Sequence, residues 1–439
     1  MKTLHIFHHS NLVNGVDQTT LTLLRGLHRM GNQVSALVPQ KGDVTAALDR
    51  DRIPYRVSDL PCCTGPSRMA ELRYLSRAAS RADEIAVWLT EEHFDLVHLN
   101  TGHLLDGAIA ATKAGIPAIW HIHAPFEVDY ARYASVMSPE GYAWLLGELG
   151  SHVLAVSEDI RQSIVKHLPP ERVTTLFNGI DVDDIDRRAA LGTEDICKTL
   201  GLGANTPIVL GVGRISAQKD FATFVTVAAE VVRLNEKVCF AIAGPAEDPA
   251  LAEHLAAHIK ALQLEKRVFL LGPRSDIPSL LMQSSVFLST AVFEGQGLAA
   301  LEAMALRKPV VAMACVGLRE CIESEQDGIL VELGDVQACA HAITRVLEDR
   351  ALAERLGHEG RKSVIRRFSA DAYAQAFDAI ATRAIEAPRC AGSGAADFTL
   401  GLLRNLREAH ERLILAEKPR TLRARARSKL QSLISPFFH

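Results

Sequence analysis

Short apolar runs alternate with longer amphipathic segments along the first half of the chain. Apolar residues recur at helical spacing in three segments, 17–30, 68–92 and 103–114. Gly31 ends the first of these predicted helices. The short runs between such segments are typical of buried strands. This alternation predicts right-handed βαβ units and a parallel sheet, with strands at 4–8, 34–38, 53–57, 96–99, 116–121, 152–156 and 173–177.

The second half repeats the alternation after a polar stretch at 186–206, which predicts a linker or an edge helix. Because 439 residues exceed one ordinary hydrophobic core, we expect two domains, at 1–186 and 187–370. Ligands of doubly wound sheets bind beyond the carboxyl ends of the strands, so two facing sheets would place the site in the cleft between them. The second set of strands is expected at 208–212, 238–243, 268–271, 286–289, 310–314 and 329–331.

The last part of the chain differs from both domains. We expect a helix at 371–385 that crosses back to the first domain, and a flexible linker and tail at 386–439. From 418 onward, basic residues accumulate without an acidic one, and the chain ends in apolar and aromatic residues. A basic amphipathic helix of this kind suits an anionic membrane surface, and it equally suits a terminal helix packed on the first domain.

The composition narrows the class of protein. With 48% hydrophobic and 23% charged residues, the chain resembles a soluble globular enzyme, and its net charge of −4 argues against general nucleic-acid binding. We find neither an apolar run of about 20 residues nor a signal-peptide core. The 8 cysteines form no CxxC pair, which predicts buried thiols in a reducing cytoplasm.

The segment 289–305, STAVFEGQGLAALEAMA, joins the end of a strand to a helix that begins at about Leu298. Glycines on either side of Gln296 let the backbone approach a ligand, and the helix N-terminus favours an anion. Glu294 and Glu302 flank this site, and a carboxylate can accept two hydrogen bonds from a vicinal diol. A ligand in which a phosphate group lies between a sugar and a ribose would therefore fit this site. A buried strand–loop–helix with two solvated glutamates is the alternative interpretation.

Two cations follow the first strand of the second domain, in GVGRISAQKD. Arg214 comes directly after Gly213, and Lys219 lies a little further on. Arginine can clamp a diphosphate as a fork and lysine as a point charge, and both can stabilise the charge that develops on a leaving nucleoside diphosphate. Taken alone, these two residues fit solvated side chains on a loop better than a diphosphate clamp.

Histidines stand at the carboxyl ends of two strands expected in the first domain, His8 and His9 at one and His121 and His123 at the other. A histidine at a sheet edge can hydrogen-bond a sugar hydroxyl, although single histidines are commonly structural. His8 and His9 also precede a helix N-terminus, which offers a second anion site. Metal binding is disfavoured because no carboxylate or cysteine completes a ligand set. The absence of Ser-His-Asp, Walker A and GxGxxG motifs argues against hydrolases, kinases and dinucleotide-binding enzymes.

In combination, these motifs resemble those of the retaining, nucleotide-sugar-dependent glycosyltransferases of family 4, which have the GT-B fold. The resemblance runs from about residue 4 to about residue 380 and is strongest at 208–334. It implies two Rossmann-like α/β domains facing across a cleft, the first for the acceptor and the second for the nucleotide sugar; in this chain a basic helical tail follows. The matching segments, in order, are NGVDQTTLTLLRGLHRMGNQV, VSEDIRQSI, LFNGID, GVGRISAQKD, FEGQGLAALEAMA and KPVVAMACVGLRECIESEQDGILVELGD.

The resemblance also implies roles for individual residues. Arg214 and Lys219 would bind the donor diphosphate and stabilise the leaving group. Glu294 would contact the transferred sugar, His123 would line that sugar near its anomeric carbon, and Glu302 would hold the ribose hydroxyls. Gly297 and Leu298 would offer backbone N–H groups to the sugar or phosphate. Other residues expected beside the donor or acceptor are Gly15, Val16, Gly213, Gly295 and Gln296. Such enzymes need no metal or other cofactor, retain the anomeric configuration by front-face attack and use no covalent nucleophile.

Three positions depart from the family pattern. Asn14 replaces a first glycine in the loop before the first helix, which would narrow the approach of an acceptor phosphate. Gln296 stands where an aromatic or apolar residue is usual, which bears on the preference for the donor sugar. Ala124 follows His123 where an aspartate is frequent. None of the three removes the cation pair or either glutamate.

We therefore expect a cytoplasmic enzyme that transfers a hexose-type sugar from a UDP- or GDP-sugar to an acceptor hydroxyl, in polysaccharide or glycolipid synthesis. The basic tail favours a lipid-linked or polysaccharide acceptor at the inner face of a membrane, with the enzyme peripheral to it. A nucleotide-sugar epimerase of the same fold is one alternative, but beyond Glu294 and the histidines there is no distinctive acid–base pair. A non-catalytic nucleotide-sugar-binding partner subunit is another; intact Arg214, Lys219 and Glu294 count against it.

Overall fold

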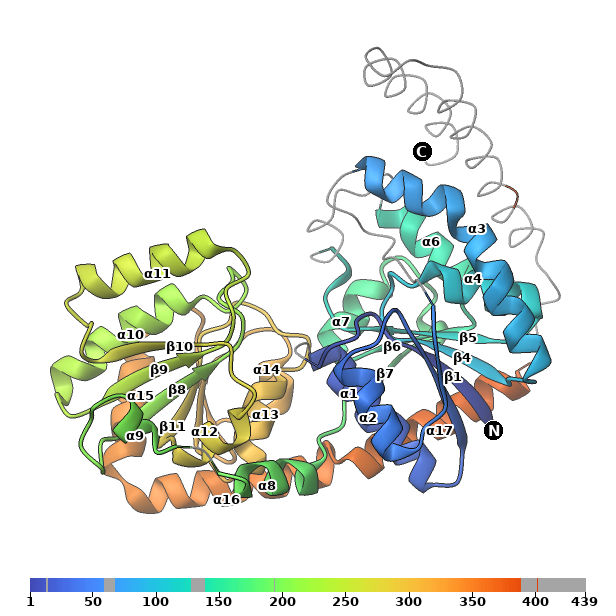
Figure 1. The fold of residues 1–439 in the computed structure, drawn as a ribbon. Helices are drawn as coiled ribbons and strands as arrows, with labels where there is room; N and C mark the ends of the chain where they lie inside the picture. The colour runs from blue at the N-terminus through green and yellow to red at the C-terminus, as the bar shows by residue number, and fades with distance from the viewer. Residues whose placement is uncertain (13–14, 59–67, 128–138, 193, 388–400, 402–439) are drawn as a thin grey trace, which may run out of the picture. The chain divides into compact units, whose positions relative to one another are not determined.

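The computed structural model describes residues 1–12, 15–58, 68–127, 139–192, 194–387 and 401. These residues pack as two compact units (Figure 1). Unit 1 comprises Met1–Leu176 together with the chain from Tyr373 onward, and unit 2 comprises Phe177–Ala372. The chain therefore enters unit 2 once and returns once. Asn14 and, apart from Gly401, the tail beyond Ala387 lie outside the described residues.

A seven-stranded parallel sheet forms the centre of unit 1, in the order β3-β2-β1-β4-β5-β6-β7. The order of the strands reverses between β1 and β4, which makes this pair the switch point where doubly wound sheets bind ligands. The strands are β1 (Lys2–Ile6), β2 (Gln33–Val38), β3 (Tyr55–Val57), β4 (Leu96–Leu99), β5 (Ala118–Ile122), β6 (His152–Ala155) and β7 (Val173–Thr175).

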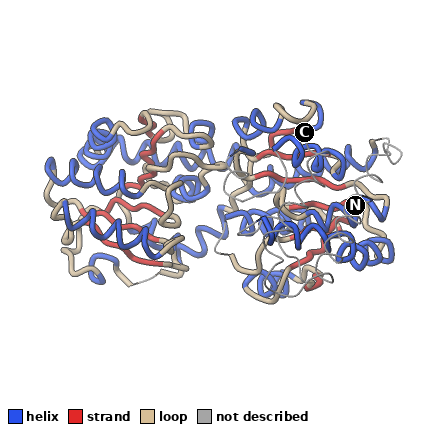
Figure 2. Tube along the Cα trace, turned by 90° about the horizontal axis from the view of Figure 1, so that it is seen from above, coloured by secondary structure: helices blue, strands red, loops and turns tan. Residues whose placement is uncertain are grey.

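Helices cover both faces of this sheet (Figure 2). Apolar residues of α1 (Gly15–Arg29), α2 (Asp43–Asp51) and α17 (Ala370–Glu386) pack on one face. The other face is covered by α3 (Arg68–Glu91), α4 (Leu105–Ala114), α6 (Pro139–Leu149) and α7 (Glu158–Ile164), and a 3₁₀ turn, η1 (Pro170–Arg172), precedes β7.

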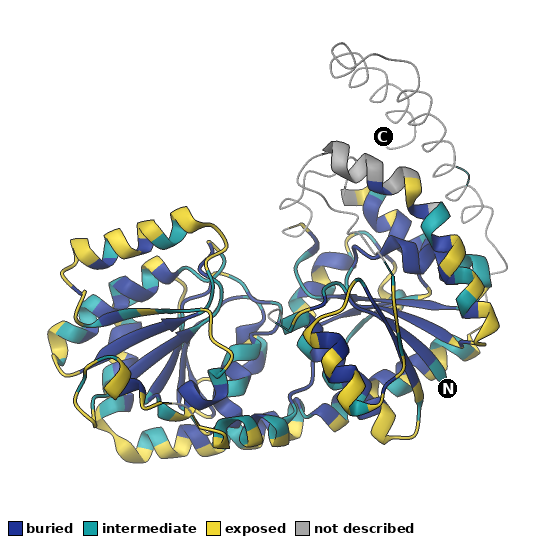
Figure 3. Cartoon of the chain, viewed as in Figure 1, coloured by how far each residue is buried: buried dark blue, intermediate teal, exposed yellow. Residues whose placement is uncertain are grey.

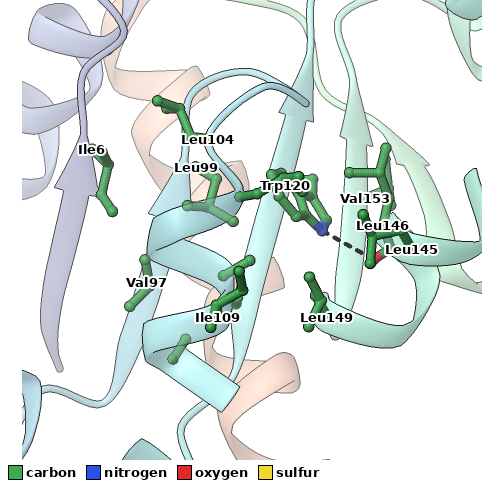
Figure 4. Packing of buried hydrophobic residues seen from close by; sticks show 14 of the residues in the cluster. Ile6, Val97, Leu99, Leu104, Ile109, Trp120, Leu145, Leu146, Leu149 and Val153 are labelled. Carbon is green, nitrogen blue, oxygen red and sulfur yellow. Dashed lines mark hydrogen bonds between the residues drawn. The ribbon is translucent and has the colours of Figure 1, made fainter. Parts of the chain in front are cut away.

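Trp120 on β5 lies at the centre of the second of these layers (Figure 4). Its side chain is fully buried among aliphatic residues of β1, β4, α4 and α6. The indole Nε1–H donates a hydrogen bond to the carbonyl of Leu146 at 3.0 Å. Its one polar atom therefore keeps a partner inside the core, as a buried tryptophan requires.

Unit 2 is built on a six-stranded parallel sheet in the order β10-β9-β8-β11-β12-β13. Its switch point lies between β8 and β11. The strands are β8 (Ile208–Val212), β9 (Cys239–Ala243), β10 (Val268–Gly272), β11 (Val286–Ser289), β12 (Val310–Met313) and β13 (Ile329–Val331).

Two separate apolar layers hold helices on the faces of this sheet. The four central strands, β9, β8, β11 and β12, are largely buried, while the outer faces of the surrounding helices are exposed (Figure 3). One layer contains α10 (Phe221–Leu234), α11 (Pro249–Ala261) and α15 (Val336–Glu348). The other contains α8 (Val182–Ala190), α9 (Ile196–Thr199), α12 (Ile277–Gln283), α13 (Leu298–Ala305) and α14 (Leu318–Cys321), with α16 (Arg350–Arg367) bordering both.

The α/β architecture predicted from the alternating pattern is confirmed, since each strand of both sheets overlaps an expected one. Two details differ. The first strand ends at Ile6, so that His8 and His9 lie in the loop after it. The residues around Asp186 form α8, which belongs to unit 2 because it packs on α12 and α13, whereas the first domain was expected to extend to that residue.

Two other features of the sequence can be compared with the described residues. Within that part of the chain, no helix is both long enough and apolar enough to cross a membrane. The described cysteines are buried and carry free thiols: Cys197, Cys239, Cys315, Cys321 and Cys339.

Candidate functional site

Loops at the switch point of unit 2 carry the residues expected to bind the donor. The loop after β8 carries Arg214 and Lys219, and the loop after β11 carries Glu294. Because β8 and β11 are parallel neighbours, their carboxyl ends meet at one edge of the sheet. The tertiary structure thus brings together two motifs that lie far apart in the sequence.

Lys219 and Glu294 form an ion pair. The ammonium of Lys219 donates a hydrogen bond to Oε1 of Glu294, and the two side chains are only 20% and 11% exposed. Gln218 Nε2 donates to the other carboxylate oxygen, Oε2, at 3.3 Å and to the carbonyl of Phe293 at 3.1 Å. Both oxygens of Glu294 have a donor, so the carboxylate is held in one orientation.

Gly213 allows Lys219 to reach this position. Its φ of 150° favours glycine, and a Cβ added there would lie 2.7 Å from Cε of Lys219. The alkyl chain of Lys219 therefore lies directly over the Gly213 backbone. The hydroxyl of Thr290 lies 3.2 Å from the carbonyl of Lys219 and 2.9 Å from that of Asp220, which joins the two loops.

Arg214 lies next to Gly213 and pairs with a different carboxylate, that of Glu247. Its Nη1 is 3.6 Å from Oε1 of Glu247, and the two side chains are 41% and 35% exposed. An exposed ion pair of this length contributes little free energy. The guanidinium of Arg214 can therefore exchange this carboxylate for a stronger anionic ligand at a small free-energy cost.

The loop that follows Glu294 turns sharply into α13. Gly297 is the N-cap residue with φ 81°, and a Cβ there would lie 2.3 Å from Cδ2 of Leu318. A Cβ on Gly317 would lie 2.5 Å from the carbonyl of Glu294 and 2.9 Å from that of Gly295. These close approaches require glycine and direct the first N–H groups of α13, starting at Leu298, toward the loop.

The side-chain amide of Gln296, in this loop, forms two hydrogen bonds with the backbone of Asn178. Its Oε1 accepts a hydrogen bond from the N–H of Asn178 at 2.6 Å, and its Nε2 donates to the carbonyl of Asn178 at 3.1 Å. The side chain of Gln296 is buried, at 2% exposure. The amide group expected beside the donor is therefore bonded to the backbone of unit 2.

Glu302 lies one helical turn into α13 and is partly buried. Burial raises the pKa of Glu302 to about 7, and the charge of Arg188 on α8 opposes this rise. Near neutral pH the carboxyl group can both donate and accept a hydrogen bond, which suits a diol ligand.

In unit 1, Asn100 connects two of the predicted site residues. Its Nδ2 donates to the carbonyl of Val16 in the first turn of α1 at 3.1 Å, and its Oδ1 lies 3.2 Å from Nε2 of His123. The bond to Val16 fixes the orientation of the amide, so Oδ1 must be the group that faces His123. His123 therefore carries its proton on Nε2, and Nδ1 remains an acceptor. Gly15 begins the same helix.

His123 is kept neutral by its surroundings. Burial, followed by the nearby His121 and His8, lowers the pKa of His123 well below its usual range. The rings of His123 and His121 lie 4.5 Å apart, and behind them His121, His98 and His5 form a buried row across β5, β4 and β1. A neutral His123 can accept a hydrogen bond from a sugar hydroxyl without changing the charge of the site.

The start of α1 is already occupied by a carboxylate. Asp17 in its first turn is fully buried, and its Oδ2 lies 2.9 Å from Nδ1 of His9. The backbone N–H of His9 donates to Oδ1 of the same residue at 3.3 Å. This pair stabilises the helix N-terminus where the sequence suggested a second anion site.

The predicted residues therefore fall into two groups, one in each unit. Arg214, Lys219, Glu294 and the start of α13 lie together in unit 2, and Val16 and His123 lie together in unit 1. Sequence reasoning missed the polar residues that hold these groups in place, namely Asn100, Asn178, Gln218 and Thr290. Of these, Asn100 had a usable signal, because it directly follows a buried strand at a switch point. In the described part of the chain, His, Cys, Asp and Glu form no group of three or more arranged to hold a metal ion.

The chain is similar to known glycosyltransferases in both halves. A family model described as Glycosyltransferase Family 4 matches residues 13–184, and one described as Glycosyl transferases group 1 matches residues 193–363. The UDP-Gal:alpha-D-GlcNAc-diphosphoundecaprenol alpha-1,3-galactosyltransferase of Escherichia coli is 28% identical over 353 residues, 78% of this chain and 87% of that protein. Alpha-maltose-1-phosphate synthase of Mycolicibacterium smegmatis is 29% identical over 296 residues, 62% and 75% of the two chains.

The fold is similar to that of a solved structure. The crystal structure of Anabaena HepE in complex with UDP and glucose has a TM-score of 0.72 at 22% identity, over 87% of this chain and 99% of that one. With the two family models and the paired sheets, these similarities establish that the chain belongs to the family 4 glycosyltransferases and has their GT-B fold.

Proposed function

We propose that the protein is a retaining glycosyltransferase that moves a hexose-type sugar from a UDP-sugar to an acceptor hydroxyl. The observation that carries this proposal is the Lys219–Glu294 ion pair beside Arg214 at the switch point of unit 2. A cation and a fixed carboxylate in contact match a ligand that has a diphosphate next to a sugar. The ammonium suits the phosphate and the carboxylate suits the sugar hydroxyls.

Donor binding redistributes the bonds of this ion pair. The diphosphate competes with Glu294 for the ammonium of Lys219 and with Glu247 for the guanidinium of Arg214. The α13 N-terminus supplies backbone N–H groups to the same anion. Glu294, still held by Gln218, is then available to accept hydrogen bonds from the sugar. These groups do the electrostatic work of a metal ion, so we propose that transfer needs none.

In the transfer step, the bond from the anomeric carbon to the diphosphate oxygen breaks and a bond from that carbon to the acceptor oxygen forms. The acceptor's proton passes to the departing diphosphate, which leaves on the face that the acceptor attacks. Arg214 and Lys219 stabilise the negative charge that accumulates on the leaving group. Glu294 is tied to Lys219 and Gln218, which favours a binding role for it over that of a covalent nucleophile.

Similarity narrows the donor and the acceptor. The Escherichia coli relative is named for a UDP-sugar donor, and HepE was solved with UDP, so we propose UDP rather than GDP. The same relative is named for an acceptor sugar on a lipid diphosphate. We propose an acceptor of that class, with His123 contacting a sugar hydroxyl through Nδ1.

Proton NMR of the purified protein with UDP-sugars and GDP-sugars tests this proposal. Slow formation of UDP and free sugar from one donor, initially with the same anomeric configuration, is the expected result. Addition of a lipid-diphosphate-linked sugar should accelerate UDP release. Arg214→Ala should lower both rates by about 100-fold or more.

Other outcomes of the same experiment overturn the proposal in different ways. A new nucleotide-sugar epimer would identify an isomerase. UDP-sugar binding without turnover, both with and without the lipid acceptor, would identify a non-catalytic binding subunit. An Arg214→Ala variant as active as the wild type would remove the assignment of the diphosphate site.

A further inference from the structure

We infer that Gln296 is a positioning residue that ties the donor loop to the segment by which the chain enters unit 2. The donor loop is defined as residues 290–297, and the entry segment as residues 177–181. The kinetic part of this inference rests on the proposed function, whereas its structural part does not. Both segments belong to unit 2.

The contact between them is a two-point hydrogen bond. The amide of Gln296 accepts from the N–H of Asn178 at 2.6 Å and donates to the carbonyl of the same residue at 3.1 Å. Gln296 and Asn178 are 2% and 3% exposed, so water does not compete for these bonds. A primary amide offers an acceptor and a donor together, whereas leucine offers neither and an ionised glutamate offers acceptors alone.

The donor loop is held firmly at the position of Gln296. The thiol of Cys321 lies 3.0 Å from the carbonyl of Gln296, and the N–H of Glu294 donates to the carbonyl of Val316 at 3.0 Å. Gly297 follows in a conformation packed against Leu318. A displacement of the Gln296 side chain is therefore passed to Glu294 on one side and to the start of α13 on the other.

The entry segment is held equally firmly. The N–H of Ile180 donates to the carbonyl of Phe368 at 2.7 Å, and the N–H of Ala370 donates to the carbonyl of Ile180 at 3.0 Å. Asp181 then caps α8, which packs on α13 and places Arg188 within electrostatic reach of Glu302. The entry segment is thus connected to the start of the donor-binding helix through Gln296, and α8 to its middle near Glu302.

These contacts imply that the loss of the Gln296 side-chain amide affects turnover much more than it affects UDP binding. Arg214 and Lys219 sit on the β8 loop and pair with Glu247 and Glu294, whereas the Gln296 amide bonds the backbone of Asn178. Loss of the Gln296 amide should therefore weaken UDP binding only slightly, through the α13 N-terminus, because Arg214 and Lys219 keep their positions. The same loss displaces Glu294 from the sugar. Small displacements of groups that contact the reacting sugar reduce turnover strongly.

Gln296→Leu tests this expectation, with Gln283→Leu as a matched control. Gln283 is a second glutamine of unit 2 whose Oε1 accepts a backbone hydrogen bond, from Ile196 at 2.8 Å, away from the donor loop. We expect Gln296→Leu to lower kcat about 10- to 100-fold and to change the Kd for UDP less than threefold, and Gln283→Leu to change neither. Wild-type kcat in Gln296→Leu, or equal losses in both variants, would overturn the inference.

Gln296→Glu is a conservative variant that should recover activity at low pH, where its carboxyl group is protonated. A protonated carboxyl group has the same acceptor–donor pair as the amide, whereas the ionised form loses the donor and faces the carbonyl of Asn178. The ratio of its kcat to that of the wild type should therefore rise as the pH is lowered from 8 to 6. A ratio independent of pH would contradict the two-point bond.

Amide hydrogen exchange separates this inference from the proposed function. In the wild type, the amide of Asn178 should exchange slowly and UDP should slow it further. In Gln296→Leu it should exchange faster and respond less to UDP. If no nucleoside diphosphate binds to either protein, the proposed function fails, yet faster exchange at Asn178 in the variant still supports the bond. Unchanged exchange would overturn it.

Discussion

The ammonium group of Lys219 is bonded to the carboxylate of Glu294, although the two residues belong to different loops of unit 2. They meet because β8 and β11 are neighbours in the sheet. One residue of the pair is suited to a phosphate and the other to a sugar, so each can be removed to test one half of donor recognition.

Glu294→Gln should separate donor binding from transfer. The substitution preserves shape but removes the negative charge that holds Lys219, so the ammonium becomes more available to a diphosphate. We expect UDP affinity to stay equal or increase, and kcat to fall about 100-fold because the sugar loses a charged acceptor. Calorimetry with UDP and steady-state kinetics measure the two effects. Glu230→Gln, which alters an exposed pair with Arg233 on α10, is the control. Weaker UDP binding in Glu294→Gln would show that the carboxylate helps to hold the diphosphate.

Gly213→Ala should move the side chain of Lys219 while the lysine itself is retained. The new Cβ would lie 2.7 Å from Cε of Lys219, so the lysine side chain must leave its path across the backbone. We expect UDP affinity to fall about tenfold, as when one charge-assisted contact is lost. Gly272→Ala is a matched control, because Gly272 also has positive φ, 67°, but a Cβ there has nothing within 4 Å. Equal losses in both variants would point to backbone strain alone.

Asn100→Leu should affect His123 specifically. Without the Oδ1 acceptor, the proton of His123 is no longer held on Nε2, and Nδ1 is no longer kept as an acceptor. We expect kcat to fall about tenfold with UDP affinity unchanged, and little further loss when the substitution is made in a His123→Ala background. Asn32→Leu is the control, since its amide donates to Asp378 elsewhere in unit 1, at 2.9 Å. Additive losses in the double variant would mean that Asn100 acts independently of His123.

The buried histidine row should make unit 1 sensitive to acid. Burial lowers the pKa of His5 and of His121 to about 3, whereas an unfolded histidine titrates near 6.5. Below pH 6.5 the unfolded chain therefore binds protons that the native state does not, so stability falls as the pH falls. Between pH 7 and pH 5 the loss should be about 2 kcal/mol for each of the two residues.

Urea unfolding followed by tryptophan fluorescence measures this loss in unit 1, because Trp88, Trp120 and Trp144 all belong to that unit. His5→Leu should reduce the difference between pH 7 and pH 5 by about 2 kcal/mol, whereas the exposed His28→Gln should leave it unchanged. A wild-type stability that is independent of pH over this range would contradict neutral burial.

Local signals in the sequence were sufficient for the secondary structure and for the chemistry of the donor loops. Apolar runs the length of strands and helical periodicity depend on near neighbours, so the sheets could be predicted from them. Arg214, Lys219 and Glu294 also stand in short motifs, whose glycines reflect local backbone requirements such as the positive φ of Gly297.

Only the tertiary structure decided which partners orient these residues. Asn100 bonds Val16 and His123 because β1, β4 and β5 are adjacent, and Gln296 bonds Asn178 across 118 positions of the chain. Gln296 departs from the aromatic or apolar residue that is usual at this position of the family pattern, and nothing near it in the sequence specifies its partner. Such hydrogen bonds depend on strand order and on distances between loops, which periodicity and motif spacing do not encode.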